Sequence, residues 1–313
     1  MTSLARSEGR NFKIPEWVMG GVYALIFLSF LIVSATNAET VRRAVEDSIV
    51  FCASTVIPSI FPFMVLSDML ASAFHSGKGS GILSRFFGVS DRLFGALTVG
   101  NVCGFPIGVK VAAKLYEDGK ITKEELEDSI GLMNNASAPF VISAIGACIY
   151  GSVFDGILLY SAILFSTLIV ALSFRQKRKE NHFSKDNTRQ RFDIAESIRS
   201  AGLSAVAVCS YIIFFSYLSS LISLFIKNDY LVAILASFTE ISGGVRLIGA
   251  LGLPRIAALP LTALVLGFSG VSVHLQAFGM LPVGISKKRY FYMKICEGAF
   301  AMMLAFLLCV FTR

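Results

Sequence analysis

The sequence predicts an all-α polytopic membrane protein with about seven transmembrane helices, two re-entrant helical hairpins and two repeats of inverted topology. Three observations predict this class. The 313 residues are 55% hydrophobic and only 16% charged, whereas soluble domains carry about 25% charged residues. Several apolar runs approach or exceed the ~20 residues with which a helix crosses a bilayer. Two further apolar stretches are interrupted by glycine in corresponding places of the two halves.

The transmembrane helices are predicted from the apolar runs at 17–35, 49–73, 130–150, 155–174, 200–226, 259–283 and 290–311. The first run follows three basic residues, so a signal peptide cleaved near Ala38 is an alternative to a first transmembrane helix. A run of about 19 residues is long for a signal peptide and favours the helix. The interrupted stretches 92–116 and 230–252 are expected to enter the membrane and return on the same side.

The positions of the basic residues predict which loops are cytoplasmic. The loops assigned to one side of the membrane are 1–16, 74–91, 117–129, 175–199 and 284–289. The other side receives 36–48, 151–154, 227–229, 253–258 and the C-terminus. With Arg92 at its edge, the first side carries 19 Lys and Arg residues and the second side five. Cytoplasmic loops are enriched in Lys and Arg, so the N-terminus is expected in the cytoplasm. The net charge of +7 follows from this bias and does not indicate a nucleic-acid partner.

The chain divides into an N-terminal tail with the first helix (1–47), a first repeat (48–174), a basic cytoplasmic linker (175–199) and a second repeat (200–313). Each repeat contains a span, a broken hairpin, a span with a polar break and a final span. The first repeat begins outside and the second inside, which gives the repeats inverted topology. Gly108-Val109-Lys110 aligns with Gly244-Val245-Arg246.

Polar breaks interrupt the second span of each repeat, at 134–139 and at 267–276. Pro139 removes a backbone donor, and paired glycines favour unwinding. Freed backbone groups are costly in hydrocarbon unless they line a cavity or are covered by protein. Two broken hairpins and two broken spans that converge are typical of the binding site of a secondary transporter.

These segments resemble a known family. Residues 100–151, with GFPIGVK at 104–110 and NNAS at 134–137, resemble the Gate, or nucleoside-recognition, domain of YlbJ-type sporulation integral membrane proteins. TEISGG (239–244) and GFSGVSVHLQ (267–276) resemble the C-terminal repeat of those proteins. The resemblance covers roughly 48–313. It implies a core similar to that of concentrative nucleoside transporters, with two hairpins and two unwound helices around the solute. It also implies a role in endospore formation, with dipicolinic acid transport as the leading activity.

The candidate solute- or ion-binding residues lie in the four broken elements. They are Gly104, Pro106, Gly108 and Lys110; Asn134, Asn135 and Ser137; Glu240, Ser242, Gly243 and Arg246; and Ser269, Ser272, His274 and Gln276.

Each charged or polar candidate has a functional and a structural interpretation. Lys110 and Arg246 are expected either to pair with an anionic solute or to form an internal ion pair or reach an interface. Glu240 is expected to carry a proton, ligate Na⁺, contact the solute or pair with one of these cations. The Asn and Ser residues line a cavity or join helices. His274 is a candidate proton carrier, with a hydrogen-bonded structural histidine as the alternative.

Two local interactions are also predicted. Thr122 is expected to cap a helix that has Glu125 at its third position, as in a capping box. Lys294 and Glu297 lie one turn apart near the inner end of the last span, which predicts a local ion pair.

The predicted function is a transporter or facilitator of a small polar organic solute, with dipicolinic acid as the leading cargo. A nucleoside transporter and a non-transporting sporulation scaffold or receptor are the alternatives. No Walker A, HExxH or GxSxG motif occurs in the sequence, and no enzymatic activity is expected. No cofactor is expected, with Na⁺ or H⁺ as a candidate coupling ion. The expected partners are the solute and the bilayer, and a homo-oligomer is an open alternative.

Overall fold

The computed structural model describes residues 16–74, 84, 87–175 and 193–312, and all of its regular elements are helical. The tail 1–15 and most of the predicted linker 175–199 lie outside the described residues. The chain forms two compact units, 1–43 and 44–313. The protein is therefore an all-helical, polytopic membrane protein, as its composition predicts.

The smaller unit contains α1 (Glu16–Thr36) and the first residues of α2 (Ala38–Phe51). The apolar run Val18–Thr36 is long enough to span a membrane, and none of it is buried within the structure. Glu39, at the start of α2, pairs with Arg42 at 2.9 Å and with Arg43 at 2.7 Å. The predicted helix at 17–35 is thus present as α1.

The first half of the larger unit continues α2 through a π-helical segment, η1 (Cys52–Val56), into α3 (Ile57–Phe74). The remaining elements of this half are α5 (Asp91–Cys103), α6 (Ile107–Glu117), α7 (Lys123–Ser129), η2 (Ile130–Met133), η3 (Phe140–Ala147) and α8 (Val153–Ser173). Thr122 and Glu125 form the predicted capping box at the start of α7. The predicted span 130–150 is broken, because residues 134–137 between η2 and η3 are not helical.

The second half, as far as the structure describes it, has a similar order of elements, without a counterpart of α7. They are α9 (Ile194–Phe225), α10 (Asp229–Thr239), α11 (Ile241–Ala250), α12 (Arg255–Phe268), α13 (Gly270–Gly279) and α14 (Lys288–Phe311). The predicted break at 267–276 is at Ser269, between α12 and α13, where φ is +80°. A left-handed backbone is rare for a residue with a Cβ, so the chain bends here at some cost in strain.

Six segments among the described residues are long and apolar enough to cross a membrane. They are Val18–Thr36, Ala38–Leu66, Val153–Ser173, Ile194–Phe225, Arg255–Gly279 and Lys288–Phe311. The seventh predicted span corresponds to η2 and η3, which are separated by the unwound residues 134–137.

Two helical hairpins occupy the interrupted stretches. α5 packs against α6, and α10 packs against α11. Their arms are 10 to 13 residues long. At about 1.5 Å per residue each arm covers roughly half of a ~30 Å hydrocarbon core. Arms of this length suit hairpins that enter the membrane and return, as predicted for 92–116 and 230–252.

One glycine after each hairpin turn lies against the opposite arm. A Cβ on Gly108 would lie 2.5 Å from Gly100 Cα, and a Cβ on Gly244 would lie 2.1 Å from Ser237 Cα. Neither position has room for a side chain, which explains why both are glycine. Each of the two glycines that the sequence aligns thus lies close to the opposite arm of its hairpin, and the repeat stays a prediction.

Polar contacts define two opposite ends of the larger unit. At one end, Arg255 at the start of α12 pairs with Asp155 near the start of α8 at 2.7 Å. Arg255 also donates to Thr312, just beyond α14, at 3.2 Å. At the other end, Arg289 at the start of α14 pairs with Asp128 on α7 at 3.2 Å. It also donates to the Phe174 carbonyl at the end of α8.

Loops that the sequence assigns to opposite sides of the membrane lie at these two opposite ends. The segments 151–154 and 253–258 lie at the first end, together with the C-terminus, and the segments 117–129 and 284–289 lie at the second. Arg92 Nη1, at the start of α5, donates to the Lys120 carbonyl at 2.6 Å and joins the second group. The 24 residues of α14 connect the ends and cover about 36 Å at 1.5 Å per residue. The structure therefore sorts these loops as the count of basic residues does.

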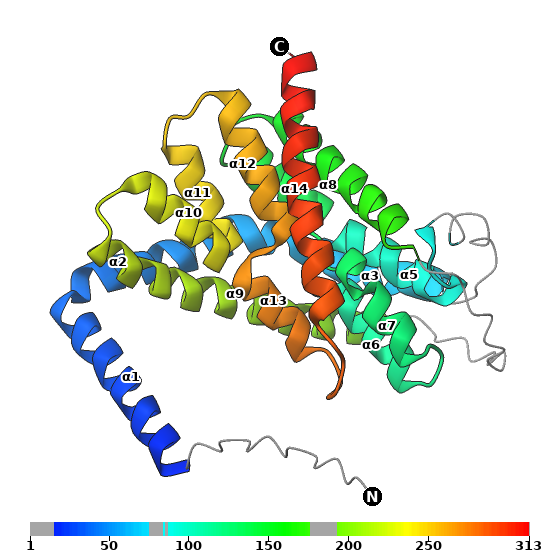
Figure 1. The fold of residues 1–313 in the computed structure, drawn as a ribbon, viewed down its shortest axis with the longest axis horizontal. Coiled ribbons are helices and arrows are strands. Elements are labelled where there is room, and N and C mark those ends of the chain that lie inside the picture. The colour runs from blue at the N-terminus through cyan, green and yellow to red at the C-terminus, as the bar shows by residue number, and fades with distance from the viewer. Residues whose placement is uncertain (1–15, 75–83, 85–86, 176–192, 313) are drawn as a thin grey trace, which may run out of the picture. The chain divides into compact units, whose positions relative to one another are not determined.

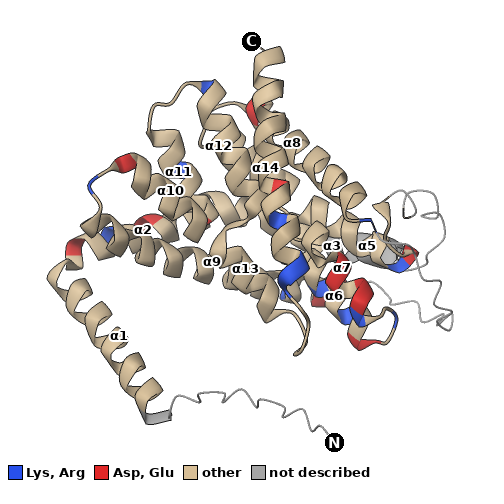
Figure 2. Ribbon diagram, viewed as in Figure 1, with Lys and Arg blue, Asp and Glu red and all other residues tan. Residues whose placement is uncertain are grey.

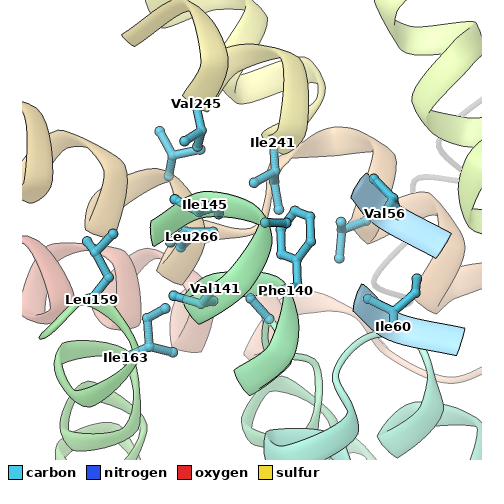
Figure 3. Close-up of a cluster of buried hydrophobic side chains, with 14 of the residues drawn as sticks. Val56, Ile60, Phe140, Val141, Ile145, Leu159, Ile163, Ile241, Val245 and Leu266 are labelled. Atoms are coloured by element: carbon cyan, nitrogen blue, oxygen red, sulfur yellow. The ribbon is translucent and has the colours of Figure 1, made fainter. Parts of the chain in front are cut away.

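The core of the larger unit joins both halves. α14 packs along α8 and α12 (Figure 1). η3 packs against α8. Figure 2 shows few charged residues on α8 and α12, whereas acidic and basic residues gather on α6 and α7. The central apolar cluster contains Phe140 and Val141 of η3, Leu159 of α8, and Ile241 of α11 and Leu266 of α12 (Figure 3). In a bilayer these side chains would otherwise face lipid, so it is close van der Waals packing that holds the cluster together.

Candidate functional site

Five of the predicted polar candidates surround one cavity between the two halves. They are Ser137, Glu240, Ser242, Ser272 and Gln276, and each has at most 5% of its surface exposed. The apolar part of the lining includes Val56, Ile60, Phe140 and Ile241, which Figure 3 shows around the same space. The cavity volume is about 20 Å³, which is enough for about one water molecule.

Glu240 forms the turn of the second hairpin. It is the residue between α10 and α11, and its carboxylate accepts hydrogen bonds from Ser242 N at 2.8 Å and Gly243 N at 2.6 Å. These donors are otherwise unsatisfied at a helix N-terminus, where the helix dipole also favours negative charge. Glu240 therefore caps α11 and at the same time places its carboxyl group at the cavity.

The other cavity residues come from the two broken spans. Ser137 lies in the unwound segment before η3, and its hydroxyl accepts from Phe140 N at 3.3 Å. Ser272 and Gln276 lie on α13, after the bend at Ser269. Gln276 Oε1 is buried and has no hydrogen-bond partner among the described residues. An unsatisfied buried acceptor is costly, so this oxygen is available to a bound molecule.

The turn of the first hairpin lies beside the cavity. Gly104 has φ +86°, and a Cβ there would lie 2.7 Å from the Ser137 backbone nitrogen. Pro106 is buried and follows a cis peptide bond from Phe105, which lines the cavity. Gly104 thus lets the hairpin turn approach the break that carries Ser137.

The structure does not bring Lys110 and Arg246 to the cavity. Both side chains lie on exposed helix faces. Lys110 Nζ donates to Ser200 Oγ at 2.9 Å, and the Arg246 guanidinium lies 5.1 Å from the centre of the Phe51 ring. The cavity lining, as far as the structure describes it, therefore contains one carboxyl group and no basic side chain.

Asn134 and Asn135 belong to a second, fully buried polar cluster. Lys294 Nζ of α14 donates to the Asn134 carbonyl at 2.9 Å, to Asn135 Oδ1 at 2.7 Å and to Glu297 Oε2 at 2.7 Å. Thr167 of α8 donates to the other carboxylate oxygen of Glu297. Lys294 and Glu297 have no exposed surface. The predicted ion pair is present, but it lies in the interior and joins the two halves.

The cluster extends through α14 to α13. Asn134 Nδ2 donates to the Tyr290 hydroxyl at 2.7 Å, and that oxygen lies 2.7 Å from His274 Nδ1. Four aromatic rings, those of Phe268, Phe278, Tyr290 and Phe291, pack around His274. His274 Nε2 has no partner among the described residues. The hydrogen bond and the packed rings match the structural interpretation of His274.

The sequence interpretation left Lys294 and Glu297 out of the candidate site. An ionisable residue in an apolar span is itself a signal of function. The helical spacing of the pair suggested a local contact near the membrane surface, and it gave no sign that Asn134, Asn135 and Thr167 would complete it. Within the described residues, no three His, Cys, Asp or Glu side chains lie close enough together to hold a metal ion.

The chain resembles a known sporulation protein over most of its length. It is 24% identical to the sporulation integral membrane protein YlbJ of Bacillus subtilis (strain 168) over an alignment of 342 positions, which covers 91% of this chain and 82% of that protein. The resemblance to YlbJ-type proteins is thereby confirmed. No family model matches the chain, and no solved structure matches it.

The similarity to YlbJ and the apolar helices support a membrane-embedded, multi-pass protein. YlbJ is an integral membrane protein of sporulation. The Gate-domain assignment, the transported solute and the orientation in the membrane stay predictions.

Proposed function

We propose that this protein is a transporter or facilitator of a small polar organic solute, not an enzyme. One observation carries the proposal. Polar groups from the broken elements of both halves meet at a single buried cavity in a protein that otherwise buries mainly apolar side chains. In a membrane protein such groups are expensive and mark solute or ion pathways. A scaffold has no need of an internal polar cavity.

The structure represents a closed conformation of the proposed transporter, because the cavity is too small for a solute. A volume of about 20 Å³ admits about one water molecule and no organic solute. The solute therefore binds only after the hairpins or broken spans move apart, as in alternating access, where one repeat moves against the other around the site. The bend at Ser269 and the unwound residues 134–137 are the points at which the two broken spans leave regular helix.

Dipicolinic acid in endospore formation is the first cargo to test, because the relative of this chain acts in sporulation. The cavity adds a condition. Glu240 is its only charged side chain among the described lining residues, and like charges repel strongly in a medium of low dielectric constant. A dipicolinate dianion would therefore enter together with protons or a cation. A nucleoside is the second candidate, because a neutral solute needs no such compensation.

The proposed location follows from the basic loops. The N-terminus and the segments 117–129 and 284–289 face the cytoplasm, because the loops of that side together carry 19 Lys and Arg residues against five on the other. In a source that forms spores, the protein resides in the forespore membrane. Na⁺ or H⁺ is the candidate coupling ion.

The proposal is tested by thermal unfolding of the detergent-purified protein with dipicolinate or a nucleoside panel, with and without Na⁺, at two pH values. A ligand that binds only the native state raises its apparent stability. Stabilisation by one of them that is lost in Glu240→Ala but kept in Lys110→Ala supports the cavity and identifies the cargo class. Lys110→Ala is the matched control because Lys110 lies outside the cavity lining.

Transport itself is tested by uptake into proteoliposomes. Glu240→Ala and Gln276→Ala are expected to abolish uptake while the protein still inserts in the membrane. Normal uptake by both variants would overturn the proposed site. No stabilisation and no uptake with either solute class would favour the scaffold.

A further inference from the structure

Lys294 has a complete set of oxygen partners in the interior of the protein. Its ammonium group lies 2.9 Å from the Asn134 carbonyl oxygen, 2.7 Å from Asn135 Oδ1 and 2.7 Å from Glu297 Oε2. A lysine ammonium carries three N–H donors, so these three oxygens satisfy all of them. The side chain has no exposed surface.

The three oxygens are of the kinds that bind a hard cation. The Asn134 carbonyl is free because residues 134–137 leave the helix, and it is joined by a side-chain amide oxygen and a carboxylate. Unwound backbone carbonyls together with side-chain oxygens coordinate Na⁺ in transporters that have broken helices. The ammonium of Lys294 thus occupies the place that an ion would take.

The charge at this place is balanced within the cluster. The negative charge of Glu297 faces the ammonium, and Thr167 donates to its second oxygen. The further polar neighbours, Asn101 beside Asn135 and Tyr290 beside Asn134, contribute an amide and a hydroxyl. His274, from α13, contacts only the Tyr290 hydroxyl among the polar groups described. Without the ammonium, one buried negative charge would remain uncompensated.

We propose that Lys294 is a tethered cation: its ammonium fills a cation site formed by Asn134, Asn135 and Glu297. The intact protein then holds no Na⁺ at this point, and removal of the lysine side chain opens a Na⁺ site. Any part that the site plays in coupling rests on the transport function proposed above. The cation site itself does not.

The test compares apparent melting temperatures of purified protein in about 100 mM sodium chloride and in choline chloride of equal concentration, because a cation that binds only the native state raises its stability. The wild type is expected to melt at the same temperature in both salts. Lys294→Ala is expected to melt lower than the wild type in choline and to regain part of the loss in sodium, with a rise that saturates as the site fills.

Two further variants make the result specific. The double variant Lys294→Ala/Glu297→Gln lacks the carboxylate charge and is expected to show no sodium effect. Lys110→Ala removes a lysine that lies outside the cluster and is the matched control, also without a sodium effect. Equal melting of Lys294→Ala in both salts, or a sodium effect that survives in the double variant, would overturn the proposal.

The wild type supplies a second measurement if Lys294→Ala does not fold in either salt. A sodium-specific rise of the wild-type melting temperature that Asn135→Ala removes would show that this site binds Na⁺ beside the lysine, and would overturn the tethered cation. These readouts need no transported solute. If the wild type shows no uptake but Lys294→Ala shows the sodium effect, only the proposed function is contradicted. If the wild type shows uptake but Lys294→Ala shows no sodium effect, only this inference is contradicted.

Discussion

Lys294 Nζ lies 2.7 Å from Glu297 Oε2, one helical turn along α14, and neither side chain is exposed. This pair is also the place where the unwound segment of the first half, α8 and the last helix of the second half meet, through Asn135 and Thr167. A buried pair of this kind holds the halves in one arrangement only as long as both partners are present.

Removal of one partner is expected to destabilise the protein strongly. Glu297→Gln or Lys294→Met should each cost about 3–5 kcal/mol, because a buried charge is left unpaired. The double variant Lys294→Met/Glu297→Leu should recover part of this loss, since no charge is then buried. Thermal unfolding in detergent measures the order of stabilities. Arg199→Ala, which breaks the exposed pair with Glu196, is the control and should change little. Single variants as stable as the wild type would contradict the role of the pair.

Glu240 is expected to act both as a helix cap and as a charge. Glu240→Ala removes two backbone contacts at the start of α11 and should cost about 1 kcal/mol, the usual value of an N-cap. Glu240→Gln keeps an acceptor oxygen and should lose less stability, although it has lost the charge. Unfolding curves measure the contribution of Glu240 as a helix cap, and uptake assays measure the contribution of its charge. If the charge is needed, both variants lose uptake, and uptake by Glu240→Gln at the wild-type rate would show that the cap alone matters.

The two hairpin glycines are expected to respond alike. A Cβ on Gly108 would lie 2.5 Å from Gly100 Cα, and one on Gly244 would lie 2.1 Å from Ser237 Cα. Gly108→Ala and Gly244→Ala should therefore each cost about 1–3 kcal/mol through overpacking. Gly202→Ala, in a helix with no atom within 4 Å of the added Cβ, should be neutral or slightly stabilising. Wild-type stability of either hairpin variant would argue against close packing of its arms.

Chemical labelling is expected to separate the two ends of the molecule. In a cysteine-free background, Val153→Cys and Pro254→Cys lie at the end that contains the Asp155–Arg255 pair and should react with an impermeant maleimide from outside. Asp118→Cys and Lys287→Cys lie at the end that contains the Asp128–Arg289 pair and should react only after permeabilisation. Opposite behaviour of all four would reverse the orientation. Different behaviour of two positions at the same end would contradict the fold.

The sequence predicted the elements well because breaks and spans are local properties. Apolar runs identified the long helices, Pro139 and the paired Asn residues marked the break at 134–137, and glycine marked the bend at Ser269. The bounds differ where helices continue past the apolar run, as in α9, which begins at Ile194.

The candidate site could be predicted only in part, because contacts between distant elements are not local. Ser137, Glu240 and Ser272 were proposed from their breaks, and they do line one cavity. For Lys110 the sequence left open contact with an anionic solute, an internal ion pair or an interface position. On α6, however, Lys110 and Lys114 lie four residues apart on the exposed face, as helical periodicity requires. That spacing was present in the sequence, whereas the partners of Lys294 became visible only in the folded chain.

Uptake of labelled dipicolinate and of a nucleoside panel by proteoliposomes tests the central claim most directly, with the cavity filled by substitution. Ser272→Phe places a large side chain in the cavity, and Ser210→Phe places the same side chain on an exposed face of α9. We expect the wild type and Ser210→Phe to take up one of these solutes and Ser272→Phe to take up none. Uptake by Ser272→Phe at the wild-type rate would contradict a solute pathway through the cavity.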